Sequence, residues 1–109
     1  PLLPGVSSAS EMIAAMDAGY EILKFFPAEA NGGAKALKAY SGPFPHVKFC
    51  PTGGITPNNL KDYLSLPAVI AVGGSWITPK QAIQSKNWAA IRQLAAEAVV
   101  LASDIVAAA

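Results

Sequence analysis

The sequence has little cysteine and little histidine, and each shortage narrows what the chain can be. Its single cysteine, Cys50, cannot form a disulfide within the chain and lies in an apolar run, which indicates a buried structural thiol. Its single histidine, His46, lies in a stretch rich in turn residues without an evident partner, which favours a bystander over a catalytic base. This cysteine usage is compatible with a reducing, cytosolic setting.

Charge and long hydrophobic runs are scarce as well. Charged residues make up 14% of the chain and the formal net charge is +1, with no basic stripe or acidic run, so neither nucleic acid nor an anionic membrane is expected as a partner. No stretch approaches the roughly 20 apolar residues of a membrane span. The hydrophobic content of 52% is high for one small domain of 109 residues, and it predicts either extensive burial or a partner that covers apolar surface.

Short apolar runs alternate along the chain with segments of helical character. The patterns predict strands over residues 22–26, 47–50 and 68–72, and helices over about 9–18, 34–40, 57–64 and from 87 onward. The first helix is expected to start at a capping box, Ser8 to Glu11, and to bury Met12, Ile13 and Met16. The helix over 57–64 is expected to have Thr56 as its N-cap.

This alternation predicts an α/β protein with a parallel sheet. Four βα units fit either a small doubly wound sheet or half of a (β/α)8 barrel. The Gly-x-Gly-x-x-Gly fingerprint of dinucleotide binding is missing after the first strand, which favours the barrel.

The predicted strand over residues 22–26 contains one lysine, Lys24. Because side chains alternate across a strand, Ile22, Lys24 and Phe26 are expected to share one face. Desolvation between two large hydrophobic side chains would favour the neutral amine, the form that attacks a carbonyl carbon to make a Schiff base. The alternative is a lysine whose stem packs on its neighbours while its ammonium reaches water.

Two successive strands end in paired glycines with a hydroxyl beside them, Thr52-Gly53-Gly54 and Gly73-Gly74-Ser75. In barrels, the loops after the last two strands often form a phosphate site, where backbone amides hold the oxygens and glycine permits their close approach. The alternative is a pair of tight turns without a ligand. A lysine that can form an imine beside a phosphate site predicts a class I aldolase that acts on a phosphorylated keto sugar.

Four motifs together resemble one family, the 2-dehydro-3-deoxy-6-phosphogluconate aldolases, over nearly the whole chain: Pro4-Gly5-Val6, the ten residues from Lys24 to Gly33, the seven from Phe49 to Ile55, and Gly73-Gly74-Ser75-Trp76. The resemblance implies a (β/α)8 TIM barrel. Residues 1–109 would be its last four βα units, strands 5–8, and so the C-terminal half of a single aldolase domain. By the same resemblance, the Schiff-base lysine is Lys24, the phosphate site comprises Gly53, Gly54, Gly74 and Ser75, and Phe26 and Thr52 line the pocket.

The activity that this resemblance implies is cleavage of 2-dehydro-3-deoxy-6-phosphogluconate to pyruvate and glyceraldehyde 3-phosphate, with 4-hydroxy-2-oxoglutarate as a further substrate. No metal or cofactor is expected, because the iminium formed on Lys24 serves as the electron sink. Members of the family are typically cytoplasmic homotrimers of the Entner-Doudoroff pathway.

The sequence departs from the family in one large respect. By the resemblance, the general-base glutamate and the carboxylate-binding arginine come from the first half of the barrel, which residues 1–109 would not include, and Glu29 is not at the matching position. A non-catalytic phosphate-binding half-barrel therefore stays open as an alternative, as does a phosphosugar isomerase or epimerase in which Lys24 acts electrostatically. Two open sheet edges and an uncovered interior face are expected to cause association.

Overall fold

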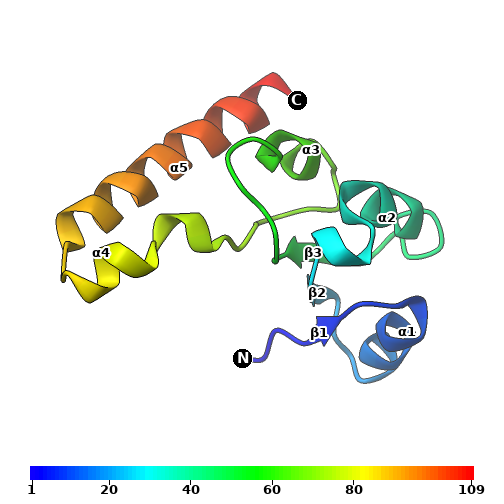
Figure 1. The fold of residues 1–109 in the computed structure, drawn as a ribbon. Helices are drawn as coiled ribbons and strands as arrows, with labels where there is room; N and C mark the ends of the chain where they lie inside the picture. Colours follow the sequence, from blue (N-terminus) through cyan, green and yellow to red (C-terminus); the bar gives the residue numbers. More distant parts are fainter.

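The computed structural model describes residues 1–109, and a small parallel sheet lies at its centre (Figure 1). The sheet has the order β1-β2-β3, and α1, α2 and α3 cover one of its faces. This arrangement confirms the α/β class and the alternation of strands and helices. The elements in chain order are β1 (Gly5–Val6), α1 (Ala9–Asp17), β2 (Ile22–Phe25), the 3-10 turn η1 (Glu29–Asn31), α2 (Gly33–Tyr40), β3 (Lys48–Pro51), α3 (Leu60–Leu64), the 3-10 turn η2 (Ser75–Ile77), α4 (Lys80–Gln84) and α5 (Trp88–Ala108).

The strand predicted over residues 68–72 is wrong as a sheet element. The segment runs parallel to β3, but it meets that strand only in two isolated bridges, Phe49 with Val69 and Thr52 with Gly73. It lies at the edge of the sheet, where the Ile70 and Gly73 amides donate to carbonyls of β3 and the Val69 amide donates to the Leu66 carbonyl instead. Apolar character predicted its extended course correctly, whereas the ladder depends on partners that a sequence pattern does not report.

The face of the sheet toward the helices is the core. Leu23 and Phe25 of β2 are fully buried there, and the Phe25 ring meets Tyr40 and Phe49 edge-on, with ring centroids 6.2 and 6.4 Å apart. Side chains of α1, α2 and α3 pack against this face of the sheet. The largest fully buried ones are Met12, Leu37, Leu60 and Tyr63.

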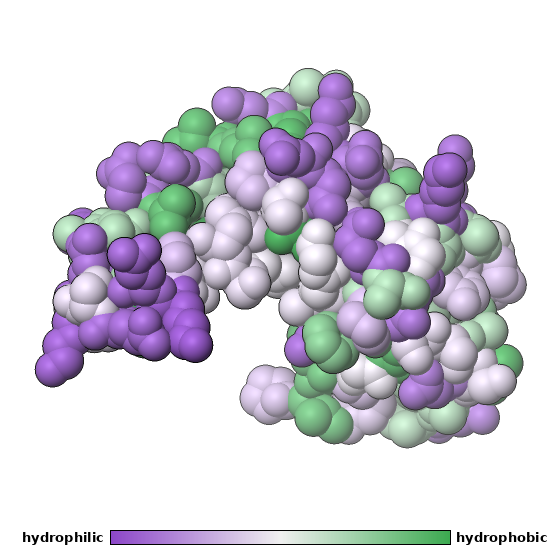
Figure 2. Space-filling model, viewed as in Figure 1, coloured by the Kyte–Doolittle hydropathy of each residue, from purple (hydrophilic) through white to green (hydrophobic).

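The opposite face of the sheet is open. Ile22 and Phe26 project there and are 48% and 50% exposed, and Leu3 and Ile70 are also largely exposed. Figure 2 shows a hollow on this side, between the lobe formed by α4 with the start of α5 and the body that contains the sheet. Strands buried on one face only leave an apolar surface of the kind that a partner or a further segment normally covers.

Two helices differ in part from their prediction. α1 begins after the N-cap Ser8 as expected, and it buries Met12, but Ile13 and Met16 are exposed. α3 begins at Leu60, later than predicted, because the residues before it form turns. The Thr56 side chain was expected to cap this helix, but it makes no cap bond. Instead, the Thr56 amide donates to Asn59 Oδ1 at 2.8 Å.

Glu11 links α1 to the residues that precede it. Its Oε1 accepts hydrogen bonds from the Ser7 hydroxyl at 2.9 Å, the Ser7 amide at 3.0 Å and the Ser8 hydroxyl at 3.0 Å. These donors, with the Ser7 hydroxyl contributing most, hold the pKa of the Glu11 carboxyl below its ordinary value. The carboxylate form is therefore favoured in the folded chain.

The stability of the chain is expected to depend on pH through Glu11. A carboxyl whose pKa is lower in the folded than in the unfolded chain stabilises the fold above the unfolded pKa, and this contribution is lost as pH falls through the folded pKa. Chemical unfolding measured in steps from pH 7 to about 3 should show a Glu11→Gln variant with a flatter profile below pH 5. Ser7→Ala should flatten it in part, and parallel profiles for all three proteins would contradict the assignment.

α5 runs along one side of the molecule without a fully buried residue. Asn87 caps its start by accepting from the Ala90 amide at 3.2 Å, and the helix begins where the sequence predicted. α5 packs on α3, α4 and η2 through one face, whose half-buried residues include Leu94, Ala98, Leu101 and Ile105. Neither α5 nor any shorter helix combines the length and hydropathy needed to cross a lipid bilayer.

Candidate functional site

Lys24 lies in the middle strand of the sheet, directly between Gly5 of β1 and Cys50 of β3. Its side chain is half-buried, and Nζ lies 4.9 Å from the centroid of the Phe26 ring, within cation–π range. An open cavity of about 370 Å³ adjoins it, lined also by Leu3 and Glu11. The shared face with Ile22 and Phe26 is confirmed, but the enclosure expected of that face is only partial because both hydrophobic side chains are half exposed.

The two glycine-rich turns lie side by side at the carboxyl ends of β3 and of the neighbouring segment. Thr52 bridges Gly73, and the Gly73 amide donates to the Pro51 carbonyl at 2.9 Å. Four backbone amides beyond this point donate to no acceptor within the chain, those of Gly53, Gly54, Gly74 and Ser75. Successive unpaired N–H groups in a turn are the arrangement that binds anions.

The conformation of the Gly53-Gly54 turn requires glycine at both positions. Gly53 has φ +107° and Gly54 has φ +75°, which residues with a Cβ rarely adopt. A Cβ on Gly53 would lie 3.0 Å from Pro27 Cα, and a Cβ on Gly54 would lie 2.7 Å from Glu29 Cγ. The room that these glycines leave is therefore filled by the loop after β2, which approaches the turn closely.

The second turn is filled in the same way by its own neighbours. A Cβ on Gly73 would lie 2.6 Å from Thr52 Oγ1, and one on Gly74 would overlap the Trp76 ring. Trp76 thus covers Gly74 at the end of this segment.

Hydrogen bonds join the lysine strand to the first turn. Beyond the end of β2, the Ala28 amide donates to the Thr52 carbonyl at 2.8 Å and the Glu29 amide to the Gly53 carbonyl at 3.1 Å. These bonds continue the pairing of β2 with β3 past the last paired residues. The strand of Lys24 and the turn with unpaired amides are consequently joined by backbone hydrogen bonds near the carboxyl ends of the strands.

Two residues at this edge have no signal in the sequence, Asn59 and Tyr63. The Tyr63 hydroxyl donates to Glu29 Oε1 at 2.5 Å, and Asn59 Nδ2 donates to the same oxygen at 3.3 Å. Burial, and then the hydrogen bond to Glu29, raise the pKa of the fully buried Tyr63 well above its ordinary value. These contacts join residues about 30 positions apart, and only the fold brings them together.

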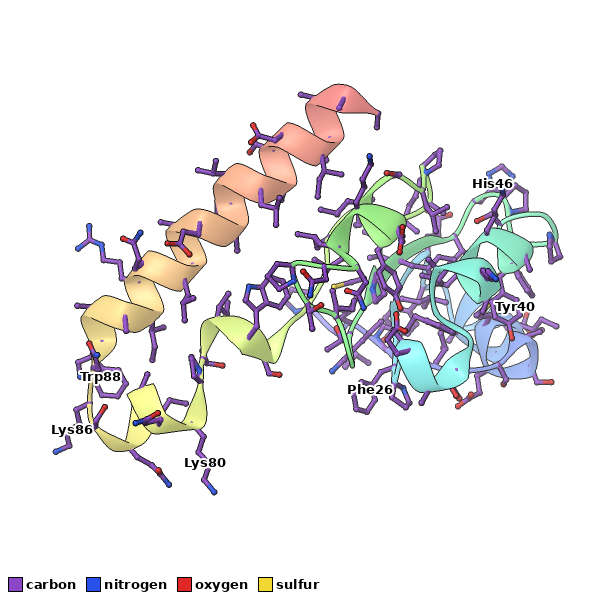
Figure 3. All side chains as sticks on the ribbon, turned by 45° about the horizontal axis from the view of Figure 1, so that its top comes forward. Phe26, Tyr40, His46, Lys80, Lys86 and Trp88 are labelled. Carbon is purple, nitrogen blue, oxygen red and sulfur yellow. The ribbon has the colours of Figure 1, made fainter.

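Several residues that could carry chemistry lie elsewhere. His46 precedes β3 at the opposite ends of the strands, and Lys80, Lys86 and Trp88 lie far from Phe26 around α4 and the start of α5 (Figure 3). No three side chains of the types histidine, cysteine, aspartate or glutamate gather closely enough to hold a metal ion.

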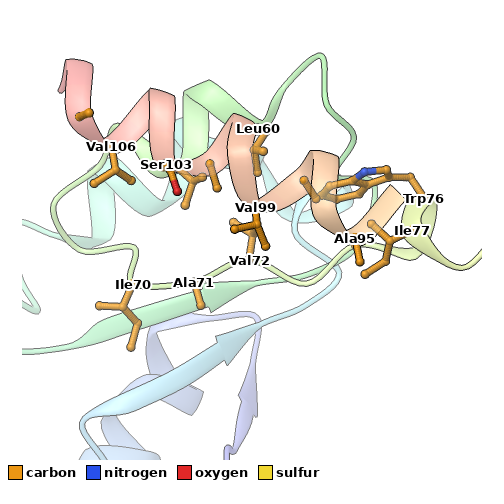
Figure 4. Close-up of a pocket in the computed structure, with 15 residues that line it drawn as sticks. Leu60, Ile70, Ala71, Val72, Trp76, Ile77, Ala95, Val99, Ser103 and Val106 are labelled. Atoms are coloured by element: carbon orange, nitrogen blue, oxygen red, sulfur yellow. The ribbon is translucent and has the colours of Figure 1, made fainter. Parts of the chain in front are cut away.

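The largest cavity of the chain is an apolar groove between α5 and the segment after β3 (Figure 4). Its volume is about 700 Å³, and 13 of its 15 lining residues are hydrophobic. Ile70 and Val72 form one wall, Val99 and Val106 the other, and Trp76 lies at one end. Lys24 is not among its residues, so the groove offers apolar surface rather than a reactive group.

A lysine in the middle strand of a parallel sheet, joined to turns with unpaired amides at the carboxyl ends of the strands, is an arrangement typical of βα-type enzyme domains. The chain belongs to the KDPG and KHG aldolase family, whose sequence model matches residues 1–94.

Individual relatives agree with this family. The 2-dehydro-3-deoxy-phosphogluconate aldolase of Pseudoalteromonas atlantica is 54% identical over 104 residues, which cover 95% of this chain and 48% of that protein. The KHG/KDPG aldolase of Escherichia coli K12 is 54% identical over 99 residues, which cover 91% and 46%. The chain therefore spans about half the length of the curated relatives it matches.

Solved structures likewise match this chain over less than half of their own length. The KDPG aldolase of Legionella pneumophila, crystallised with pyruvate captured as a covalent carbinolamine, superposes with a TM-score of 0.83 at 56% identity over 86% of this chain and 46% of that one. A 2-keto-3-deoxy-6-phosphogluconate aldolase of Zymomonas mobilis superposes with a TM-score of 0.70 at 50% identity over 72% and 38%.

Proposed function

We propose that the protein carrying this chain is a class I aldolase that cleaves 2-dehydro-3-deoxy-6-phosphogluconate to pyruvate and glyceraldehyde 3-phosphate, and that also accepts 4-hydroxy-2-oxoglutarate. The observation that carries the proposal is the position of Lys24, in the middle strand and next to turns whose amides are unpaired. Identities of 54% to 56% with aldolases support it, one of them holding pyruvate covalently.

In this reaction, Lys24 Nζ attacks the C2 ketone and water leaves, which forms an iminium. A base removes the C4 hydroxyl proton, the C3–C4 bond breaks, and its electron pair moves toward the iminium nitrogen as glyceraldehyde 3-phosphate departs. The enamine that remains is protonated at C3 and hydrolysed to pyruvate, and Lys24 is regenerated. The iminium is the electron sink, so the proposed reaction includes no metal or cofactor.

The proposed phosphate site consists of the amides of Gly53, Gly54, Gly74 and Ser75. Their lack of partners supports this role, because an amide that already donates a bond would have to break it to bind an oxygen. Phe26, beside the Lys24 ammonium, and Thr52, between the two turns, are proposed to line the pocket.

We further propose that residues 1–109 form the last four βα units, strands 5–8, of a (β/α)8 barrel. The open face of the sheet and the apolar groove along α5 would then be covered by the first half, which would also bring the general base and the cation for the pyruvate carboxylate. A cytoplasmic homotrimer of the Entner-Doudoroff pathway completes the proposal, by resemblance to the family.

One observation favours the alternative, a non-catalytic half-barrel that binds phosphate. Glu11 is the only carboxylate that lines the cavity next to Lys24, and three hydrogen bonds already occupy its Oε1. Release of pyruvate from the phosphorylated keto acid, followed with the native protein, separates the two functions. Turnover supports the aldolase, whereas phosphate binding without turnover supports the alternative.

Replacement of Gly53 tests the phosphate site directly. A Gly53→Ala variant should bind inorganic phosphate at least about tenfold more weakly, and it should lose about 1 to 3 kcal/mol of stability, because alanine is strained at this φ and its Cβ meets Pro27 and Ala28. Gly42→Ala is the matched control, since its Cβ meets only the Ala39 carbonyl at an ordinary 3.5 Å. Phosphate titration followed by NMR measures the phosphate affinity of both variants. An unchanged affinity in Gly53→Ala would remove this residue from the site.

A further inference from the structure

Glu29 contacts the Gly53-Gly54 turn directly in two ways and through Asn59 in a third. Its backbone amide donates to the Gly53 carbonyl at 3.1 Å. Its stem fills the space beside Gly54, where Cγ and Cβ would lie 2.7 and 2.8 Å from an added Cβ. Its carboxylate accepts from Asn59 Nδ2, and the same nitrogen donates to the Gly54 carbonyl at 3.0 Å.

The carboxylate is itself held in place from the helix layer. Tyr63 lies fully buried in α3, and its hydroxyl donates to Glu29 Oε1 at 2.5 Å. Asn59 is fixed in turn, because its Oδ1 accepts from the Thr56 amide at 2.8 Å. A continuous set of hydrogen bonds thus runs from the hydrophobic core, through Glu29, to the carbonyl of Gly54.

These contacts bear on the amides that face outward from the turn. Gly53 and Gly54 have backbone conformations that a glycine pair can easily leave, and their amides make no bond that would hold them in place. An anion site gains affinity when its donors are already oriented, because less conformational freedom is lost on binding. The contacts from Glu29 provide this orientation.

We propose that Glu29 is a positioning residue, which holds the Gly53-Gly54 turn in its anion-binding conformation and at a set distance from the strand of Lys24. The proposal rests on the phosphate site proposed above and assigns Glu29 no proton transfer. Glu29 immediately follows Ala28 in the loop that Lys24's strand enters, so one short segment connects the imine-forming group with the phosphate-binding turn. Loss of Glu29 is therefore expected to weaken the binding of a substrate's phosphate group and to leave the reaction at Lys24 unchanged.

The test compares Glu29→Ala, Glu29→Gln and Tyr63→Phe in the native protein that carries this chain. Glu29→Ala removes stem and carboxylate, so the Kd for inorganic phosphate and the KM for the phosphorylated keto acid should rise about tenfold. Glu29→Gln keeps the stem and one acceptor oxygen and should recover most of this loss. Tyr63→Phe removes only the hydroxyl and should weaken phosphate binding several-fold.

Two measurements separate positioning from a general loss of structure. The kcat/KM for 4-hydroxy-2-oxoglutarate, which has no phosphate, and the yield of pyruvate trapped on Lys24 by borohydride should stay within about twofold in every variant. Tyr40→Phe is the matched control for Tyr63→Phe, since Tyr40 packs against Phe25 and Phe44 and its hydroxyl makes no hydrogen bond within the chain.

The outcomes are distinct. Unchanged phosphate affinity in Glu29→Ala overturns the positioning role, as does an equal loss for phosphorylated and unphosphorylated substrates. If the unaltered protein traps no pyruvate, the proposed aldolase function fails, while a tenfold change in the phosphate Kd would still support the role of Glu29. If the unaltered protein binds no phosphate, the site and the positioning role both fail.

Discussion

A Lys24→Ala variant is expected to form no covalent adduct with pyruvate. The unaltered protein, treated with pyruvate and then borohydride, should gain the mass of one reduced pyruvate, because reduction converts the iminium on Lys24 into a stable amine. Turnover of the phosphorylated keto acid should fall by a factor between about 10⁴ and 10⁶, the range found when a nucleophile or its activating base is removed. Intact-mass spectrometry and pyruvate release measure the two effects.

Lys48→Ala is the matched control, since Lys48 lies in the neighbouring strand β3 and is also half-buried. Its Nζ donates to the Pro67 carbonyl at 3.2 Å, so it is directed away from the Lys24 cavity. It should keep the full adduct. An adduct that persists in Lys24→Ala, or is lost only in Lys48→Ala, would contradict the assignment of the nucleophile.

The total mass of the adduct reports on the rest of the barrel. A protein about twice the mass of this chain, with a Lys24-dependent adduct, would support a complete aldolase of the relatives' length. An adduct on a protein of this chain's mass would mean that this half activates its lysine alone. The absence of any adduct would remove the Schiff-base reaction and leave the phosphate-binding alternative.

A Phe25→Ala variant is expected to lose about 3 to 5 kcal/mol of unfolding free energy. Phe25 is fully buried at the centre of the core, and its ring contacts Tyr40 and Phe49 edge-on, so truncation removes two aromatic contacts and leaves a cavity. Urea unfolding followed by tryptophan fluorescence measures the change.

The adjacent residue provides the control for this prediction. Phe26 projects from the other face and is 50% exposed, so Phe26→Ala in this chain should cost about 1 kcal/mol or less. Equal costs for the two variants would mean that the open face of the sheet is covered in solution, by a second copy or by further polypeptide. A small cost for Phe25→Ala would contradict the placement of the core.

Local chemistry was sufficient to predict most of the helices. Three predictions are confirmed: the N-cap at Ser8, the start of the last helix near Asn87 and the strands in the apolar runs of β2 and β3. Each depends on residues within a few positions of one another. The strand over 68–72 failed because the segment meets β3 only in two isolated bridges, and how far two neighbouring segments pair depends on their packing, which a sequence pattern does not report. Ile13 and Met16 were expected to be buried, and they are exposed because no element of this chain packs against that side of α1.

The candidate site divides in the same way. Lys24 was recognisable as a charged residue in an apolar strand, and the paired glycines as repeated strand endings. The sequence offered only a ligand or a tight turn as the reason for these glycines. It did not show that Pro27, Glu29 and their neighbours fill the space that a side chain would need. The family resemblance supplied the roles of these residues, which remain proposals.

The sequence by itself specifies the class of fold, the order of its elements and the residues that could take part in a reaction. The fold class and the element order follow from backbone preferences and from the repeats of helix and strand, which composition and alternating apolar patterns reveal. The folded chain alone places Lys24 beside the glycine turns and connects Glu29 with Asn59 and Tyr63. The open face of the sheet is likewise evident only in the tertiary structure. These features depend on contacts between segments distant in sequence, and such contacts are selected by the packing of the whole chain.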